Sequence, residues 1–289
     1  MRIAGVLALL ALVSSAQQAP PLADHLFDSE GVRIRYVEQG QGAPVVLIHG
    51  FTGSLDRHFV SNGVFAHLAK DHRVIAFDCR GHGKSGKPHD PKAYGNQMAQ
   101  DIVRLLDHLN IARAHIVGFS LGALITGHLL TTHPERFLTA TFVGHHPSRR
   151  WTAEEAAQAE ALAQDLEGEA PFRSLIIALS PPGQRPSEDE IRKTAQGLVA
   201  TNDVKALAAV QRGYQTLSVT SAQLANVRVP LLEIIGSEDH NIADMRELKK
   251  EVPQLRVVVV DGATHGGERG ILRRPEFLST LREFLAAQR

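Results

Sequence analysis

The chain is poor in cysteine and has no excess of charge of either sign. Its single cysteine, Cys79, excludes an intramolecular disulfide and any zinc or iron–sulfur site built on several cysteines. The 31 basic and 31 acidic residues cancel, so net charge gives no support for nucleic acid or an anionic membrane as a partner. A composition of 43% hydrophobic residues over 289 positions is globular and excludes a disordered tail or a coiled coil. We expect one large domain, or one domain with an insertion.

Apolar runs of membrane-spanning length, about 20 residues, are also absent. The run that comes closest to this length lies at the start of the sequence. There Met1-Arg2 precede an apolar run from Ile3 to Val13, which is followed by Ser14-Ser15-Ala16. This order is typical of a cleavable signal peptide, here residues 1–16. We therefore expect a secreted or periplasmic protein without a stable membrane anchor. The alternative interpretation is a buried N-terminal helix.

Short apolar runs recur along the chain and indicate its fold class. They lie at 45–48, 74–77, 115–118, 140–143, 231–235 and 257–260. Continuous runs of this length are typical of strands buried on both faces of a parallel sheet. Helical stretches such as 98–109 and 121–132 fall between them, so the pattern predicts an α/β protein with a doubly wound, mostly parallel sheet. Residues 31–39 alternate apolar and polar residues and predict a half-exposed strand of an antiparallel hairpin.

The alternation stops between residues 148 and 227, where no run is typical of a strand. Thr152 and Ser187 each stand three residues before a glutamate, which is the capping-box pattern of a helix start. Pro181-Pro182-Gly183 divides the stretch in two. We predict a helical cap insertion over 148–227, in a core formed by 24–147 and 228–289. The alternative is an ordinary crossover helix with a long loop.

A nucleophile motif lies between a predicted strand and a predicted helix. Gly118-Phe119-Ser120-Leu121-Gly122 matches G-x-S-x-G, in which a tight strand-to-helix turn exposes the serine hydroxyl. The flanking small residues let the strand and the helix approach each other. Because the motif stands in the context it requires, we predict Ser120 as the nucleophile.

A serine hydroxyl needs a base to take its proton, and the base needs a carboxylate to orient it. Asp239 follows the run 231–235, and His265 follows the run 257–260. Both candidates therefore lie at the sheet edge where open α/β sheets bind ligands. We predict a Ser120–His265–Asp239 triad, with Glu238 and Asp261 as rivals of Asp239.

The oxyanion formed during acyl transfer needs two hydrogen-bond donors. We expect these to be the backbone N–H groups of Leu121, directly after the nucleophile, and of Phe51, in the loop after the first parallel strand. His49 precedes that loop, and we interpret it as a structural hydrogen-bonding residue rather than a catalyst.

With these pieces in order, the chain resembles the α/β-hydrolase fold superfamily, from about residue 30 to the end. The resemblance rests on His49-Gly50-Phe51, on Asp78 to Ser85, on the turn at Ser120, on Gly236 to Asp239 and on His265. The segment from Asp78 to Ser85 is similar to the D-x-R-G-x-G-x-S loop of esterase, lactonase, epoxide-hydrolase and dehalogenase branches. The stretch 148–227 stands where those branches carry a cap.

Differences among the branches narrow the chemistry. Dehalogenases and epoxide hydrolases of this fold use an aspartate nucleophile, so Ser120 implies acyl transfer to water. Some branches carry the triad acid after the strand that here ends at Val143, but Gly144-His145-His146-Pro147 holds no carboxylate. Many relatives have a bulky residue after the base, whereas His265 precedes Gly266-Gly267.

The remaining candidates are a pair of adjacent histidines and several residues that could line the substrate pocket. Adjacent residues of an extended chain point to opposite sides, so we expect His145 and His146 not to share a metal ion. We predict that His145 and Trp151 line the substrate pocket, although core packing is an equal alternative for Trp151, Phe172 and Leu175.

Three further residues are expected to have structural roles. Cys79 is interpreted as a small buried hydrophobe. Asp78 and Arg80 are expected to fix their loop by hydrogen bonds.

The sequence thus predicts an exported serine esterase that acts on a small-molecule ester or lactone. It needs no cofactor and no metal, and it has no nucleic-acid partner. Lactonase, carbon–carbon bond hydrolase and perhydrolase activities stay open with the same triad. A binding protein that kept the fold without catalysis is the alternative from another class. The sequence leaves the oligomeric state open.

Overall fold

The computed structural model describes residues 22–147, 151–180 and 183–288. The predicted signal peptide, residues 1–16, lies outside this range, as do Pro181 and Pro182. Within it, eight strands form one sheet in the order β1-β2-β4-β3-β5-β6-β7-β8. β1 and β2 join antiparallel, and all neighbours from β4 to β8 pair in parallel. The predicted doubly wound, mostly parallel sheet is confirmed.

The elements follow the predicted order closely. The strands are β1 (His25–Ser29), β2 (Val32–Gln39), β3 (Pro44–Ile48), β4 (Arg73–Phe77), β5 (Ala114–Phe119), β6 (Phe137–Val143), β7 (Leu231–Gly236) and β8 (Arg256–Val260). The helices outside the segment 148–227 are α1 (Val64–Leu68), α2 (Asn96–His108), α3 (Leu121–Thr132), α9 (Ile242–Glu251) and α10 (Pro275–Ala286), with short turns η1 (Asp56–Val60) and η2 (Pro91–Ala93).

Two apolar layers enclose the sheet because successive strand residues point to opposite faces. On β3, Val46 and Ile48 face a core shared with α2 and α3, whereas Val45 and Leu47 face a core shared with α1 and α10. Burial on both faces explains why the central strands consist of continuous apolar runs. The carboxyl ends of the parallel strands therefore meet at one edge, between the two helical layers.

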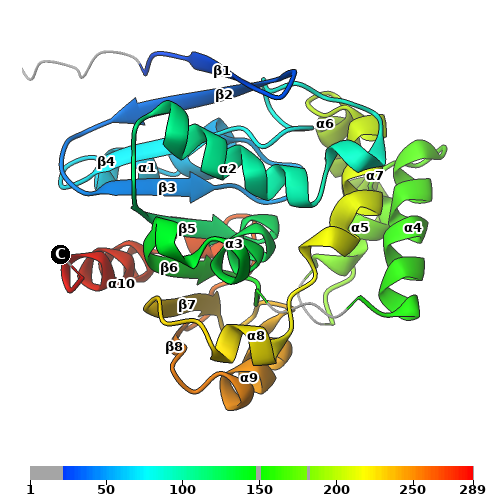
Figure 1. Ribbon diagram of the computed structural model, residues 1–289. Helices are drawn as coiled ribbons and strands as arrows, with labels where there is room; N and C mark the ends of the chain where they lie inside the picture. The colour runs from blue at the N-terminus through cyan, green and yellow to red at the C-terminus, as the bar shows by residue number, and fades with distance from the viewer. Residues whose placement is uncertain (1–21, 148–150, 181–182, 289) are drawn as a thin grey trace, which may run out of the picture.

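Helices fill the segment between β6 and β7. They are α4 (Ala153–Glu167), α5 (Arg173–Ala178), α6 (Glu188–Val199), α7 (Val204–Gly213) and α8 (Ser221–Ala225), with the short turn η4 (Tyr214–Leu217). Thr152 and Ser187 form the predicted capping boxes at α4 and α6. In Figure 1, α4 to α7 gather beyond the arrowheads of β3 and β5, at the carboxyl edge of the sheet. We call α4 to α8 the helical insertion.

Two expectations about strand exposure are wrong. β2 is not half-exposed, because Arg35 is 4% exposed and its guanidinium pairs with Asp24, Asp56 and Asp78. β8 is not buried on both faces, because it is the last strand of the sheet, and Val259 is 44% exposed. A polar residue can thus be buried when carboxylates surround it, and an apolar run can lie at the edge of a sheet.

No helix in the described ranges is long and apolar enough to cross a bilayer.

Candidate active site

Ser120 lies in a strained turn between β5 and α3. Its backbone has φ 54° and ψ −115°, and non-glycine residues rarely adopt positive φ. The flanking glycines make the turn possible. A Cβ added at Gly118 would lie 2.1 Å from the Gly122 carbonyl oxygen, and one at Gly122 would lie 2.3 Å from the Ile48 carbonyl oxygen. The backbones of β3, β5 and α3 therefore approach too closely for any side chain, and the serine is held where they meet.

The structure brings the three predicted triad side chains together. His265 Nε2 lies 3.0 Å from Ser120 Oγ, and His265 Nδ1 lies 2.9 Å from Asp239 Oδ2. Asp239 is fully buried and His265 is 8% exposed. The backbone N–H of Asn241 donates to Asp239 Oδ1 at 3.0 Å, so both carboxylate oxygens have a partner. This arrangement orients a base toward a hydroxyl group.

The loops after β7 and β8 are joined to each other, which fixes Asp239 relative to His265. The Glu238 N–H donates to the Ala263 carbonyl at 3.0 Å, and the Ser237 N–H donates to the Val260 carbonyl at 2.9 Å. The rival acids are used elsewhere. Glu238 pairs with Arg269 at 2.8 Å, and Asp261 accepts a hydrogen bond from Ser237 Oγ.

Aromatic rings and a glycine enclose His265. The Phe119 ring stacks on it at 5.1 Å, and the His240 ring lies 4.8 Å away on a tilted plane. Gly144, at φ 67°, approaches so closely that an added Cβ would lie 3.2 Å from His265 Nδ1. The groups that pack around His265 therefore come from the ends of β5 and β6 and from the loop after β7, although two glycines follow the histidine.

The two predicted oxyanion donors belong to segments that both adjoin the nucleophile. Leu121 opens α3, and the N–H groups of a first helical turn have no partner within the helix. Phe51 stands in a turn closed by the Gly53 N–H donating to the Gly50 carbonyl at 3.1 Å. A Cβ at Gly50 would lie 2.9 Å from Ser120 Cβ, so this turn presses directly against the serine.

His49 supports the turn before Phe51 and is structural, as expected. Its Nε2 accepts the Cys79 N–H at 3.0 Å, so Nδ1 carries the proton and donates to the Gly50 carbonyl at 2.8 Å. Burial lowers the pKa of His49. His49 therefore joins the loops after β3 and β4. Cys79 itself is buried, and burial raises the pKa of its thiol well above the ordinary value, as suits an inert residue.

The segment from Asp78 to Ser85 is held by buried charges, as predicted. Asp78 accepts the N–H groups of Leu55 and Lys84, each at 2.8 Å. Arg80 forms two hydrogen bonds to Asp101, at 2.7 and 2.6 Å. These bonds place the loop after β4 beside the turn that contains Phe51.

Two functional neighbours were missed from the sequence. His58, in η1, accepts the Gly50 N–H at 3.2 Å and packs edge-on against Phe119 at 4.9 Å. Glu233, on β7, is fully buried, and neither carboxyl oxygen has a hydrogen-bond partner in the described part of the chain. Burial and the neighbouring Asp239 raise the pKa of Glu233 well above its usual range. Glu233 is the one polar residue in the run 231–235, and this exception is the feature of the sequence that could have identified it.

Predicted pocket residues have mixed outcomes. Phe172 is fully buried in a small cluster of the helical insertion, with Leu175 against it, so both serve packing there. Trp151 packs, partly buried, against the core on the α2 and α3 face. Its role in a pocket, like that of His145, stays a prediction.

The expected divergence of His145 and His146 is wrong. Their rings lie 5.0 Å apart, because the chain bends there instead of running extended. His145 Nδ1 lies 2.7 Å from the His146 carbonyl oxygen. In the described residues, the group of three side chains with metal-binding geometry is a different one, formed by Asp239, His240 and His265.

A cleft of about 740 Å³ separates the core from the helical insertion beside the Phe51 turn. Thr52 and Arg57 line it from the core, and Lys193 and Asn202 line it from α6 and the residues after it. Asn202 Nδ2 contacts the Thr52 carbonyl at 3.5 Å. The insertion therefore reaches the residue next to a predicted oxyanion donor.

Comparison with known proteins gives consistent results. A family model described as alpha/beta hydrolase fold matches residues 43–267. The chain is 28% identical over 251 residues to a putative 2-succinyl-6-hydroxy-2,4-cyclohexadiene-1-carboxylate synthase of Bacillus subtilis, covering 82% of this chain and 89% of that protein. It is 29% identical over 240 residues to 3-oxoadipate enol-lactonase 2 of Acinetobacter baylyi, covering 81% and 87%. A carboxylesterase structure from Nitrososphaera gargenis superposes with a TM-score of 0.73 at 21% identity, covering 92% and 98%; at this identity the match shows a shared fold.

Proposed function

Because this chain belongs to the α/β-hydrolase fold family, we propose that it is a serine hydrolase that cleaves carboxylic esters through an acyl-enzyme. One observation carries the proposal. Ser120 Oγ lies 3.0 Å from His265 Nε2, and His265 Nδ1 lies 2.9 Å from Asp239 Oδ2. Asp239 and His265 are buried, whereas Ser120 is partly exposed. The family contains relatives named as esterases and lactonases, which supports ester-type substrates.

The mechanism follows from the positions of the atoms. Ser120 Oγ attacks the ester carbonyl carbon while His265 Nε2 takes the hydroxyl proton. His265 then gives that proton to the leaving alcohol, and an acyl-Ser120 ester forms. A water molecule, deprotonated by His265, attacks the acyl group and releases the acid. Asp239 holds the ring with Nδ1–H toward itself and stabilises the charged imidazole.

The backbone amides of Phe51 and Leu121 stabilise the negative oxygen of each tetrahedral intermediate. Loss of one such donor lowers kcat by about 10²–10³-fold in serine hydrolases. Here both donors come from backbone that the glycines at 50, 118 and 122 hold close to the serine. The site is therefore organised before substrate arrives, and no cofactor enters these steps.

The test is hydrolysis of p-nitrophenyl esters with acyl chains of two to twelve carbons. We expect Ser120→Ala to lower kcat by about a thousandfold or more with an unchanged unfolding temperature. Asp239→Asn should lower kcat by about 10⁴-fold because it favours the wrong tautomer of the histidine. Glu238→Gln, which alters the neighbouring exposed acid, is the matched control and should retain activity. Near-normal turnover by the Ser120→Ala variant would refute the proposal.

A lactone is the second candidate substrate, favoured by the similarity to an enol-lactonase along 81% of this chain. The chemistry is the same, except that the leaving alcohol stays attached to the acyl group. Comparing kcat/KM for a lactone and for the open-chain ester of equal carbon number separates the two. Carbon–carbon cleavage and perhydrolysis use the same triad and would be assayed next if both substrates fail. A folded protein without covalent labelling of Ser120 by a fluorophosphonate would favour a binding function.

We also propose export of the protein, with cleavage after Ala16. The support is the order of basic, apolar and small residues at positions 1–16. N-terminal sequencing of the protein recovered from the periplasm or medium of an expressing bacterium tests this. A mature protein that begins at Gln17 is the expected result, and uncleaved protein retained in the cytoplasm would contradict it.

A further inference from the structure

His240 stands beside the triad without a part in the mechanism. It directly follows Asp239 in the loop after β7, and its side chain is 27% exposed whereas that of Asp239 is fully buried. Its Nδ1 lies 3.4 Å from Asp239 Oδ1, and its ring lies 4.8 Å from the ring of His265. Two imidazole rings therefore face one carboxylate, one toward each oxygen.

We propose that Asp239, His240 and His265 form a binding site for a divalent transition-metal ion of the zinc class, and that the ion inhibits the enzyme. The ligand atoms of the three side chains all lie within 4.8 Å of one another. Two histidine nitrogens and one carboxylate oxygen are a donor set that zinc accepts, with a fourth position left for water. Imidazole donors also suit copper and nickel.

Binding requires the three donor atoms, which lie within 4.8 Å of one another, to draw closer together. Metal–ligand bonds of about 2.0–2.1 Å around a tetrahedral ion place neighbouring donors about 3.4 Å apart. The His240 Nδ1 to Asp239 Oδ1 separation already has this value, and the His265 Nδ1 to Asp239 Oδ2 separation is 2.9 Å. His240 Nδ1 is buried and has no hydrogen-bond partner in the described residues, so the ion would give this nitrogen a bonding partner.

Asn241 opposes binding and limits the affinity. Its Nδ2 lies 3.1 Å from His240 Nε2 and donates to the Gly144 carbonyl at 2.9 Å. A metal ion on Nδ1 leaves the ring proton of His240 on Nε2, where it would face another donor. The Asn241 amide must then turn its oxygen toward the ring and give up its bond to Gly144.

Inhibition follows from the tautomer of His265 and rests on the proposed serine mechanism. An ion on Nδ1 of His265 leaves the ring proton on Nε2, which lies 3.0 Å from Ser120 Oγ. Nε2 can then donate to the hydroxyl but cannot accept its proton, so the nucleophile is not activated. The ion also displaces the carboxylate that orients the ring.

The experiment titrates ester hydrolysis with zinc chloride, and each variant is compared with its own zinc-free rate. His240→Asn removes the imidazole at similar size, and His89→Asn, at an exposed histidine paired with Asp203, is the matched control. We expect His240→Asn to raise the half-inhibitory zinc concentration by about tenfold or more, since loss of even an outer-shell partner costs about 10–100-fold in metal affinity. His89→Asn should change nothing, and a chelator should restore activity.

A direct binding measurement separates this proposal from the proposed function. Ser120→Ala keeps all three ligands, so its binding of zinc by calorimetry, or of cobalt by visible absorption, needs no turnover. If adding His240→Asn to the Ser120→Ala variant weakens metal binding, the result supports the site even if the protein cleaves no ester. Equal zinc sensitivity and binding with and without His240 would overturn it. So would binding abolished by His145→Asn or His146→Asn instead, or no binding at millimolar zinc.

Discussion

The sheet core and the helical insertion are held together by different kinds of contact. In the core, charged partners such as Arg80 and Asp101 are almost completely buried, with side chains 4% and 1% exposed. In the insertion, Arg212 pairs with Glu160 and Glu167, and the three side chains are 27%, 46% and 40% exposed. The core therefore fixes atoms through buried bonds, whereas the insertion relies on surface pairs. We therefore expect the core to hold reacting groups in precise positions, and the insertion to tolerate substitutions better.

Apolar packing shows the same difference. The two core clusters extend along the sheet and both its helical layers. The cluster inside the insertion is small; its buried members are Ala163, Leu166, Phe172, Leu198, Leu207 and Ala208. Phe51 is the joint between the two regions, because its side chain packs against both the main core and this cluster. A movement of the insertion would therefore act on Phe51, whose backbone N–H is a predicted oxyanion donor.

The sharpest test of this comparison replaces one arginine in each region. Arg80→Met leaves the buried Asp101 carboxylate with only the Ser29 hydroxyl at 2.5 Å and Arg104 at 3.9 Å. The loss of the buried arginine should cost about 3–5 kcal/mol of unfolding free energy. Arg212→Met removes half-exposed pairs and should cost at most about 1 kcal/mol. Urea denaturation of both variants measures the difference. Equal losses would mean that the ion pairs of the insertion are as important as those of the core.

A second test compares one carboxyl group from each region across pH. The pKa of Glu233 is raised in the folded protein, so its contribution to stability is present below pH about 4.3 and is lost as pH rises toward the raised value. While the pH lies between these two values, the loss is about 1.4 kcal/mol per pH unit. Glu233→Gln removes this loss, so the unfolding free energy of the variant, relative to that of the parent protein, should increase from pH 5 to pH 7.

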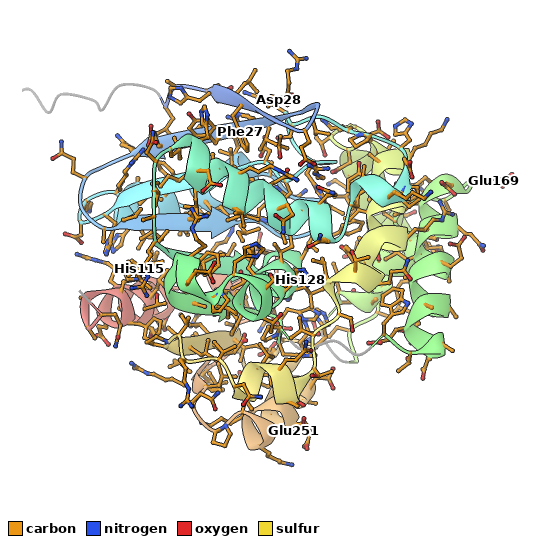
Figure 2. All side chains as sticks on the ribbon, in the orientation of Figure 1. Phe27, Asp28, His115, His128, Glu169 and Glu251 are labelled. Atoms are coloured by element: carbon orange, nitrogen blue, oxygen red, sulfur yellow. The ribbon has the colours of Figure 1, made fainter. Side chains whose placement is uncertain are left out.

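Glu169→Gln is the control, at an exposed residue of the insertion that Figure 2 shows at its outer edge. Its unfolding free energy should follow the parent curve at both pH values. Thermal or urea unfolding at pH 5 and pH 7 measures all three proteins. Parallel curves for the parent and for Glu233→Gln would contradict the interpretation of Glu233 as a neutral buried acid.

The smallest expected effects come from one glycine in a helix of each region. In α3, a Cβ at Gly122 meets the Ile48 carbonyl oxygen at 2.3 Å, whereas at Gly197 in α6 nothing lies within 4 Å. Gly122→Ala should destabilise by about 1–3 kcal/mol, as overpacking does, and lower kcat by displacing Ser120. Gly197→Ala should stabilise by about 0.5–1 kcal/mol. Melting temperatures and rates of ester hydrolysis of both variants test this prediction. Stability changes of the same sign in the two variants would refute the contrast between the regions.

Sequence reasoning was most successful where a residue pattern and a backbone geometry require each other. The glycines around Ser120 predict a turn that no other residue permits, and Asp239 and His265 could be located because strands end just before them. His58 could not be found, because its contact with Gly50 depends on how η1 folds back over the loop after β3. The sequence does not single out Glu233, because this residue stands inside an apolar run that predicts a buried strand.

The insertion was predictable in type but not in position. Capping boxes at Thr152 and Ser187 are local, so the sequence indicates where α4 and α6 begin. Where these helices contact the core depends on single long-range contacts, such as Asn202 to the Thr52 carbonyl. Arg35 illustrates the same limit in the core, since only the assembled structure surrounds it with three carboxylates.

The connection between β6 and β7 has a consequence for how such enzymes diversify. These strands are parallel neighbours, with Ala140 opposite Leu231, and parallel neighbours always need a long crossover. Here that obligatory crossover is the whole helical insertion. Its length and sequence can therefore drift without shifting the register of any strand. Substitutions in the β6–β7 connection can therefore change which substrates fit, while the sheet keeps the reacting atoms in position.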